Sequence, residues 1–426
     1  MRYSAPRGTK DVFPPESGTL QRIEEAFRRT CSLYGYGEVR TPTFEAAELF
    51  LRTTGETTDI VTKEMYLFRD RGGREMALRP EVTPGVVRAW LQVGGGGGGV
   101  ARLFYIGSIF RYERPQAGRY REAHQVGVEA LGSDSPLLDV EVIDLCGKFL
   151  GALGLQDLSL EVNSMGCPKC RPLYREAMVQ ALGAQRDQLC ELCQRRLEQN
   201  PLRILDCKTP ECKQLSARVP PITEYLCEEC GSRFQQVQEG LSALGYRFAV
   251  QPRMVRGLDY YTRTVFEISS TRLGAQAQVC GGGRYDDLVE ELGGPPTPAA
   301  GFACGLERIA LLLGDAGGEQ RTQPVFVAYT GESLQAAAFA FAARLREAGV
   351  AAEMDYDASS LRAQMRSANR AGAAWAALFG EDEQAAGAVT LRDMSSGEQE
   401  MLPLEEAVRR LAERVTTQAS ETGGEQ

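Results

Sequence analysis

The chain has 426 residues, a formal net charge of −9, 43% hydrophobic residues and 25% charged residues. This is the composition of a globular protein, and the length predicts about three domains. No stretch approaches the ~18 consecutive apolar residues of a membrane span, and no apolar run typical of an export signal follows the N-terminus. We therefore expect a cytoplasmic protein that has no membrane partner. The acidic total argues against a general nucleic-acid coat, although local basic patches still permit binding.

The shortage of histidine and lysine excludes several kinds of chemistry. His124 is the only histidine, and only six of the 48 basic residues are lysine. The sequence contains no H-E-x-x-H metal motif, no P-loop, and no G-x-G-x-x-G after a strand-like run. Any nucleotide must therefore be held mainly by arginines. A GC-rich genome is the alternative explanation for the arginine bias as a whole.

The N-terminal part predicts a helix followed by a hairpin. Leu20, Ile23, Phe27 and Cys31 follow a helical period that ends near Gly35. Further on, residues 103–113 and 125–131 have strand-like patterns, and the segment between them contains Pro115 and Gly118. We expect an antiparallel hairpin whose long loop carries four arginines, Arg111, Arg114, Arg119 and Arg121.

The second arm of this hairpin is a candidate ligand-binding strand. Gln125, Gly127 and Glu129 share one face because side chains alternate along a strand. Gly127 leaves a gap between an amide and a carboxylate, into which a small polar ligand would fit. An edge strand whose polar side chains simply face water is the alternative. His124 points to the opposite face, where a structural role is favoured over a catalytic one.

Residues 167–230 contain eight of the twelve cysteines in four pairs, Cys167 and Cys170, Cys190 and Cys193, Cys207 and Cys212, and Cys227 and Cys230. Two C-x2-C pairs nineteen residues apart match the spacing of thiolate zinc sites, since a tetrahedral ion takes two ligands from each of two turns. The alternative is a set of reduced cysteines in a small helical domain. Structural zinc among the cysteines of 167–230 is thus a possibility, and the pattern leaves the metal unknown.

The C-terminal part alternates strands and helices. Strands are expected at 324–331, 350–356 and 373–380, with helices between them, which predicts a separate α/β domain. The second of these helices places Arg362, Arg366 and Arg370 on one face. Such a stripe is a candidate RNA surface, and a merely solvated face is the alternative.

Several segments together resemble the histidyl-tRNA synthetase family, a class II aminoacyl-tRNA synthetase family, over nearly the whole chain. They are "PRGTKDVFP" near the start, "LRPEVTP" at 78–84, "FRYERPQAGRYREAHQVGVE" at 110–129, "RGLDYYTRTVFE" at 256–267, "CGGGRYDDL" at 280–288 and "GFACGLERI" at 301–309. The resemblance implies an α+β catalytic core with a mostly antiparallel sheet, a helical insertion domain and a C-terminal α/β anticodon-binding domain. The implied boundaries are 1–165 and 245–320 for the core, 166–244 for the insertion and 324–415 for the anticodon domain. We expect a disordered tail at 416–426.

The resemblance also implies an activity. A member of this family activates L-histidine with ATP and Mg²⁺ to histidyl-adenylate, releases pyrophosphate, and transfers the histidyl group to the 3' end of tRNA(His). It would act as a homodimer. Positioning and charge neutralisation supply much of the catalysis of such a reaction, and planar arginines suit both tasks.

The residues that the resemblance assigns fall into four groups. Arg111 and Arg256 would be catalytic, at the α-phosphate. The histidine-binding residues would be Glu81, Val82, Thr83, Arg111, Gln125, Glu129, Arg256, Tyr260, Tyr261 and Tyr285. The ATP-binding residues would be Arg111, Glu113, Arg119 and Arg308, and the tRNA-binding residues would be Arg114, Gln116 and Arg121.

Two other classes of protein compete with this interpretation. One is a catalytically inactive synthetase paralogue that regulates histidine biosynthesis. The other is a zinc-stabilised RNA-binding protein without ligase activity. The presence of Arg111, Arg256 and Arg308 and of a C-terminal domain argues against both.

Overall fold

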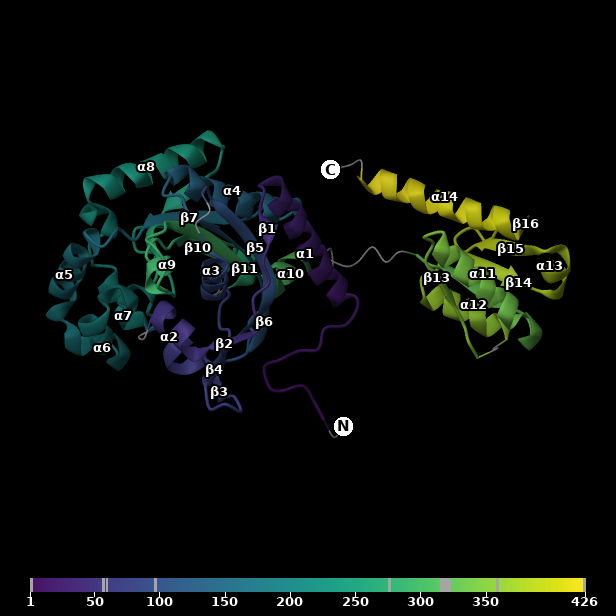
Figure 1. The fold of residues 1–426 in the computed structure, drawn as a ribbon, viewed down its shortest axis with the longest axis horizontal. Helices are drawn as coiled ribbons and strands as arrows, with labels where there is room; N and C mark the ends of the chain where they lie inside the picture. Colours follow the sequence, from purple (N-terminus) through teal and green to yellow (C-terminus); the bar gives the residue numbers. More distant parts are fainter. Residues whose placement is uncertain are drawn as a thin grey trace. The chain divides into compact units, whose positions relative to one another are not determined.

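A computed structural model of the chain describes residues 3–55, 58, 60–95, 98–274, 277–314, 323–357 and 360–423, with side chains up to residue 414. The chain divides into two compact units, residues 1–319 and 320–426 (Figure 1). None of the helices in the described ranges has the length and apolar character that a membrane crossing requires.

Unit 1 is built on an eight-stranded sheet of order β1-β5-β6-β11-β10-β9-β7-β8. The pairs β1/β5 and β7/β8 at the two edges are parallel, and the pairs between them are antiparallel. The strands are β1 (Gly37–Glu38), β5 (Ala101–Phe110), β6 (Glu122–Leu131), β7 (Ser159–Ser164), β8 (Phe248–Val250), β9 (Thr262–Ser269), β10 (Gln278–Arg284) and β11 (Ala299–Gly305). The predicted hairpin is therefore confirmed as β5 and β6, and the mostly antiparallel sheet is confirmed.

The main core lies between one face of this sheet and four helices. These are α1 (Glu16–Leu33), α4 (Pro136–Ala152), α8 (Glu228–Ala243) and α10 (Leu306–Leu313). The apolar period of α1 buries Ile23, Phe27 and Cys31 against this core, which confirms the predicted first helix. Phe234, Val237 and Leu241 of α8 join the same core although the sequence places them in the insertion segment.

The remaining elements of unit 1 surround the other face and one end. A small sheet pairs β2 (Phe44–Ala46), β4 (Glu75–Leu78) and β3 (Tyr66–Arg69). Beside it are α2 (Ala47–Thr54), η1 (Ile60–Glu64), α3 (Thr83–Gln92) and α9 (Leu288–Glu291). The short η5 (Thr271–Leu273) lies instead beside α10, with Leu273 against the main core.

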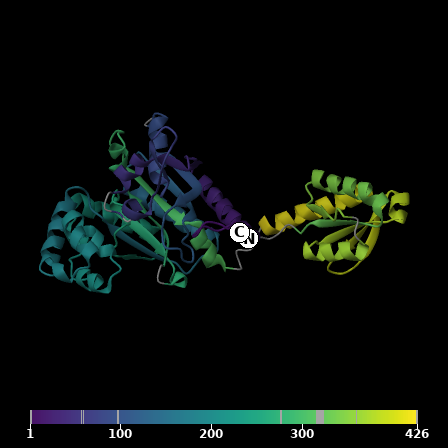
Figure 2. The same cartoon turned by 90° about the horizontal axis from the view of Figure 1, so that it is seen from below.

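The insertion helices gather at one end of unit 1 (Figures 1 and 2). They are α5 (Cys170–Gly183), η2 (Arg186–Gln188), α6 (Glu191–Gln199), η3 (Pro201–Asp206), α7 (Pro210–Ser216) and η4 (Ile222–Tyr225). Their small core of twelve buried residues includes three cysteines, Cys193, Cys207 and Cys212. Because so few large apolar side chains meet there, this segment has little hydrophobic stabilisation of its own.

Unit 2 is an α/β domain, as predicted. Its sheet has the order β13-β12-β14-β15-β16, with β12 (Val325–Tyr329), β13 (Ala352–Met354) and β14 (Trp375–Phe379) parallel. The antiparallel strands β15 (Ala388–Asp393) and β16 (Gln399–Pro403) were not predicted. The helical elements are η7 (Glu332–Leu334), α11 (Gln335–Glu347), α12 (Leu361–Arg370), α13 (Glu381–Ala386) and α14 (Leu404–Gly423).

The two sheet faces of unit 2 are covered by different helices. Helices α11 and α14 share one core with the sheet, and α12 packs on the opposite side against Phe326 and Ala328. The fully buried Gln364 of α12 bridges the backbone N–H and C=O of Tyr329, at 3.0 and 2.8 Å.

Helix α14 extends into the tail 416–426 that was expected to be disordered. The backbone of 416–423 continues α14, because no proline or glycine interrupts the chain between Leu404 and Thr422. Residues 424–426 lie outside the described residues.

Candidate functional site

A cavity of about 510 Å³ lies over the face of the large sheet that α1 and α4 leave uncovered. Strands β6, β9, β10 and β11, the start of α3 and the loop before β9 all contribute lining residues. Every residue predicted to bind histidine or ATP lines it, namely Glu81, Val82, Thr83, Arg111, Glu113, Arg119, Gln125, Glu129, Arg256, Tyr260, Tyr261, Tyr285 and Arg308. The sheet therefore brings together residues that are up to 227 positions apart in the chain.

Glu129 lies at the closed end of this cavity and is 1% exposed. Its Oε1 accepts a hydrogen bond from Thr83 Oγ1 at 2.5 Å, and its Oε2 accepts one from the Tyr285 hydroxyl. Burial raises the pKa of Glu129 to about 8, although both hydrogen bonds oppose the shift. The carboxyl group is therefore largely protonated at neutral pH while the cavity holds no ligand.

Glu81 is the second buried carboxyl group of the cavity. Thr54 Oγ1 donates to its Oε1, and the Tyr260 hydroxyl donates to its Oε2, both at 2.6 Å. Burial raises the pKa of Glu81, whereas the nearby charge of Arg111 opposes that shift. This end of the cavity thus offers two carboxyl groups within a frame of hydroxyl groups, which suits a small ligand that has N–H donors.

The prediction that Gly127 leaves a gap for a ligand is wrong. Tyr105 of β5 pairs in register with Gly127, and its phenol fills the space where a side chain at 127 would stand. Gly301 of β11 likewise leaves room for the Glu129 carboxyl, and Gly281 of β10 leaves room for the Arg256 guanidinium. Glycine in these strands therefore serves to seat neighbouring side chains against the sheet.

Arginines also line the cavity. Arg111 Nε donates to Pro80 O at 2.8 Å, and Arg256 Nη1 donates to Glu267 Oε2 at 2.8 Å. Both guanidinium groups line the cavity. Arg111 follows β5 and Arg256 precedes β9, and these two strands flank β6, β11 and β10 in the sheet.

Arg119 and Arg308 form a second pair of cations. Arg119 Nη1 donates to Glu113 Oε2 at 3.3 Å, and Arg308 Nε donates to Gln278 O at 2.5 Å. Burial lowers the pKa of Arg308, and the positive charge of Arg119 lowers it further. Two like charges held close together in a cavity favour an anionic ligand, because an anion relieves their repulsion.

The residues predicted to bind tRNA lie outside this cavity. Arg114 and Gln116 are exposed in the loop between β5 and β6, and Gln116 closes the tip of that loop by pairing with Arg119. The side chain of Arg121 is less exposed to solvent, because its guanidinium stacks 3.7 Å from the centre of the Tyr112 ring. The backbone N–H of Arg121 donates to Gly8 O at 2.7 Å.

His124 has a fixed partner on α10. Its Nδ1 lies 2.7 Å from Glu307 Oε1, and its backbone N–H donates to both oxygens of the same carboxylate. The hydrogen bond to Glu307 raises the pKa of His124. This arrangement joins β6 to α10. His124 and Glu307 also line the cavity, so His124 does not lie away from the candidate site as expected, and its structural role stays a prediction.

Sequence reasoning missed two residues of the insertion segment that support the site. Asn200 Nδ2 and Arg203 Nε both donate to Asp259 Oδ1, at 3.1 and 2.9 Å, and Asp259 directly precedes Tyr260. No local pattern marks Asn200 or Arg203, because their partner is more than fifty residues away. Tyr105 was missed too, although a tyrosine opposite a glycine in the predicted hairpin was a usable signal.

Comparison with known proteins agrees with this arrangement. Residues 8–309 match the family model described as histidyl-tRNA synthetase. The chain belongs to the histidyl-tRNA synthetase family. Residues 324–414 match the model of an anticodon binding domain. The chain is 48% identical to a histidine--tRNA ligase of Pelotomaculum thermopropionicum over 98% of this chain and 99% of that protein.

Other relatives give the same result. A histidine--tRNA ligase of Desulforudis audaxviator is 49% identical, over 96% of this chain and 99% of that protein. The crystal structure of apo histidyl-tRNA synthetase from S. aureus superposes with a TM-score of 0.82 at 33% identity, covering 96% of this chain and 100% of that one. A Bacillus halodurans structure titled as an ATP phosphoribosyltransferase regulatory subunit/histidyl-tRNA synthetase covers 89% of this chain and 98% of its own at 21% identity, with a TM-score of 0.63, and shares the fold.

Proposed function

We propose that this chain is a histidine--tRNA ligase. In the first step a carboxylate oxygen of L-histidine attacks the α-phosphorus of ATP, and the bond to the bridging oxygen breaks to release pyrophosphate. In the second step a hydroxyl of the 3'-terminal adenosine of tRNA(His) attacks the histidyl carbonyl and releases AMP. The observation that carries the proposal is one cavity lined by two buried carboxyl groups, Glu81 and Glu129, together with Arg111, Arg119, Arg256 and Arg308.

The closed end of the cavity is proposed to bind histidine. Glu129 and the tyrosines would pair with the imidazole, which has one donor and one acceptor edge. Glu81, Thr83 and Gln125 would accept the ammonium group. A competitor without an imidazole would leave the buried polar groups unpaired, which costs roughly 10⁴-fold in rate. The proposed histidine-binding residues are Glu81, Val82, Thr83, Arg111, Gln125, Glu129, Arg256, Tyr260, Tyr261 and Tyr285.

The arginines of the cavity are proposed to bind ATP. Arg111 and Arg256 would hold the α-phosphate during attack, and Arg119 and Arg308 would hold the other end of the nucleotide. The carboxylates Glu113 and Glu267, each paired with an arginine of the cavity, are the groups that fit Mg²⁺. When bound, Mg²⁺ neutralises phosphate charge.

The tRNA contacts are proposed at two places. Arg114, Gln116 and Arg121 would meet the acceptor end beside the cavity, and unit 2 would bind the anticodon. The exposed Arg362, Arg366 and Arg370 of α12 support the second assignment, since they offer adjacent positive charges to phosphates. The proposed domains are the catalytic core at 1–165 and 245–320, the insertion at 166–244 and the anticodon-binding domain at 324–415. The chain is further proposed to form a homodimer, to be cytoplasmic and to bind zinc in the insertion segment.

Pyrophosphate exchange into ATP tests the proposal. The folded chain is assayed with Mg²⁺ and each of the twenty amino acids in turn, without tRNA. Exchange with histidine alone is expected. Absence of exchange with every amino acid would instead support the inactive regulatory paralogue, and tRNA binding without exchange would support an RNA-binding protein.

A further inference from the structure

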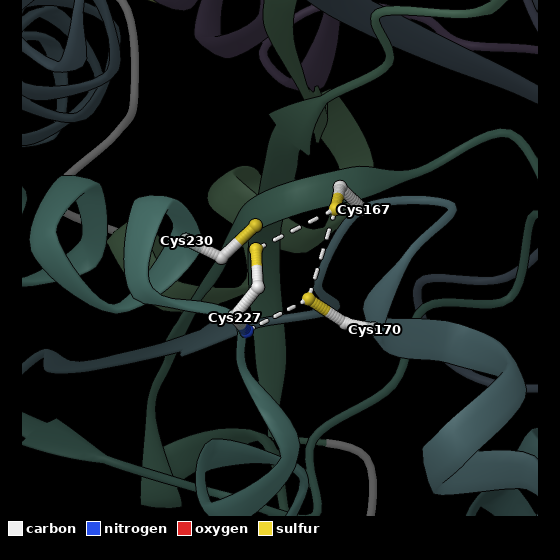
Figure 3. Close-up of side chains that lie close together, drawn as sticks. All are labelled: Cys167, Cys170, Cys227 and Cys230. Carbon is white, nitrogen blue, oxygen red and sulfur yellow. Dashed lines mark hydrogen bonds between the residues drawn. The ribbon is translucent and has the colours of Figure 1, made fainter.

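The eight cysteines of the insertion segment form two clusters of four. The outer cluster consists of Cys167, Cys170, Cys227 and Cys230, and the inner cluster consists of Cys190, Cys193, Cys207 and Cys212. The four thiol groups of the outer cluster point toward a common centre (Figure 3). The expected metal site formed by the two C-x2-C turns nineteen residues apart, Cys167/Cys170 and Cys190/Cys193, is wrong. The first turn lies with Cys227 and Cys230, and the second lies with Cys207 and Cys212.

The spacing of the sulfur atoms matches a tetrahedral thiolate site. In each cluster all four Sγ atoms lie within 4.8 Å of one another. The distance from Cys167 to Cys170 is 3.7 Å, and the distances from Cys167 to Cys227 and from Cys190 to Cys207 are both 3.9 Å. Zinc–sulfur bonds of ~2.3 Å in a tetrahedron place the sulfur atoms ~3.8 Å apart. All eight cysteines are free thiols.

The surroundings of both clusters favour thiolates. Backbone N–H groups point at sulfur, from Cys227 to Cys170 Sγ at 3.1 Å and from Cys190 to Cys212 Sγ at 3.3 Å. The positively charged guanidinium of Arg263 also lies near the Cys230 sulfur. An ion with four thiolates carries a net charge of −2, so donors and cations in this position stabilise it.

We propose that this chain binds two structural Zn²⁺ ions, one in each cluster, and that the two ions hold the insertion segment against the loop at 256–261. The four thiols of each cluster release their protons to solvent as the ion binds. The metal sites rest on the cysteine geometry alone, whereas their effect on histidine binding rests on the proposed function.

The outer cluster closes the base of the insertion. Cys167 follows β7, Cys170 begins α5, and Cys227 directly precedes α8, so an ion there joins the two ends of the segment. The next residue, Arg171, donates to the Tyr261 carbonyl. Arg263 contacts Glu229 at 2.9 Å and Asp286 at 3.1 Å. These contacts connect the outer cluster with both sides of the loop that carries Tyr260 and Tyr261.

The inner cluster supports the other contact with that loop. Cys193 lies in α6 and Cys207 follows η3, and the residues between them include Asn200 and Arg203, which hold Asp259. Three of the four inner cysteines belong to the small core of the insertion. Removing the ion therefore removes a large part of what fixes Asn200 and Arg203 in place.

The third group of neighbouring cysteines carries no such proposal. Cys146, Cys280 and Cys304 lie in the main core, and Cys280 and Cys304 are joined as a disulfide. This group therefore lacks the four free thiolates that the other two clusters supply.

Metal content tests the two sites directly. Full-length protein purified from zinc-supplemented cells is expected to contain two zinc ions per chain by plasma mass spectrometry. Cys167→Ser/Cys170→Ser and Cys190→Ser/Cys193→Ser are each expected to contain one. Cys31→Ala, which removes a buried thiol of α1, is expected to keep two. A content near zero, or a cluster variant that keeps both ions, overturns the corresponding site.

A second measurement avoids the variants, in case either one fails to fold. A thiol-specific mercurial added to the intact protein is expected to release two zinc ions, detected by a zinc-binding dye, and replacement by Co²⁺ is expected to give the charge-transfer absorption of a tetrathiolate site. Release of no zinc, or recovery of disulfides from the eight cysteines, overturns the proposal.

The positioning effect has its own test. Loss of either ion is expected to raise the KM for histidine in pyrophosphate exchange by roughly tenfold or more, because small misplacements of binding groups are costly. An unchanged KM in a variant that has lost zinc overturns the positioning role. If the zinc-replete wild-type chain shows no exchange at all, the proposed function fails while the metal sites stand.

Discussion

Arg203 of the insertion segment and Asp259 of the loop before β9 form a largely buried ion pair, with Arg203 Nε 2.9 Å from Asp259 Oδ1. Arg203 is 5% exposed. Through this pair a helical segment outside the large sheet fixes the residue that directly precedes Tyr260. The part of the cavity proposed to bind histidine therefore depends on a contact that the sheet itself does not make.

Replacing Arg203 tests that dependence. Arg203→Met is expected to raise the KM for histidine by roughly tenfold with a smaller change in kcat, because Asp259 loses its main cationic partner and the loop shifts. Pyrophosphate exchange at varied histidine concentration measures both constants. Arg186→Met is the matched control, since Arg186 pairs with Glu198 in the same segment but is exposed. Equal effects of the two substitutions would contradict the prediction.

The raised pKa of Glu129 predicts a pH effect on stability without ligand. Because the folded state keeps the proton up to a pH of about 8 while the unfolded state releases it near 4.5, stability falls as the pH rises between these values. Glu129→Gln removes this contribution. Between pH 5 and pH 8 the free energy of unfolding of the variant is therefore expected to fall less than that of wild type, by on the order of 4 kcal/mol. Urea unfolding across this range measures the difference.

The exposed Glu48→Gln on α2 is the control for that experiment. It is expected to leave the slope of stability against pH unchanged. Parallel slopes for wild type and Glu129→Gln would show that Glu129 ionises normally in the folded protein.

His124 offers a titration that needs no assignment, because it is the only histidine. Its pKa is raised above 6.5 by Glu307, so the pair stabilises the protein fully below that pH, and the contribution is lost as the pH rises through the raised value. The imidazole proton signal in an NMR titration is expected to report a pKa above 6.5. Glu307→Gln is expected to lower it, and a pKa at or below the ordinary value in wild type would refute the ion pair.

The proximity of Arg119 and Arg308 predicts a selective effect on ATP. Arg308→Gln is expected to raise the KM for ATP by about tenfold or more, because a charge-assisted hydrogen bond to phosphate is lost. The KM for histidine is expected to change by less than about threefold. Arg272→Gln, on the exposed η5, is the control. A larger effect on histidine than on ATP would reverse the proposed orientation of the two substrates.

The arginines of α12 are expected to affect tRNA binding and charging but not the activation of histidine. Arg362→Gln/Arg366→Gln is expected to lower the rate of tRNA charging and to reduce the slope of log affinity against log salt by about one for each lost phosphate contact. Pyrophosphate exchange is expected to stay at the wild-type level. Arg409→Gln on α14 is the control, because that arginine is already paired with Glu406 and Glu413. Unchanged charging would identify the stripe as a solvated face.

Much of this architecture follows from local pattern. The hairpin β5/β6, the helix α1 and the alternation in unit 2 were predictable because period and turn residues agree over many positions. The strands β15 and β16 were not, since "AVTLRD" and "QEMLP" are short and their pairing depends on neighbours in the sheet.

The site shows the same division. Residues within recognisable motifs, such as Glu81, Glu129 and Arg256, were predicted from the family resemblance, and the structure brings all three into one cavity. Asn200 and Arg203 were not found, because their function depends on a long-range approach to Asp259 that no spacing encodes. The pairing of the cysteines failed for the same reason, since four C-x-x-C-like turns permit several combinations and only the folded chain selects one.

The insertion segment leaves and rejoins the sheet at its edge, between the adjacent parallel strands β7 and β8. A module attached there can lengthen, shorten or gain metal ligands without altering the register of β6, β9, β10 or β11, on which the cavity is built. Evolution is thus free to remodel this part of the chain, while its few contacts with Asp259 and Tyr261 still connect it to the loop at 256–261.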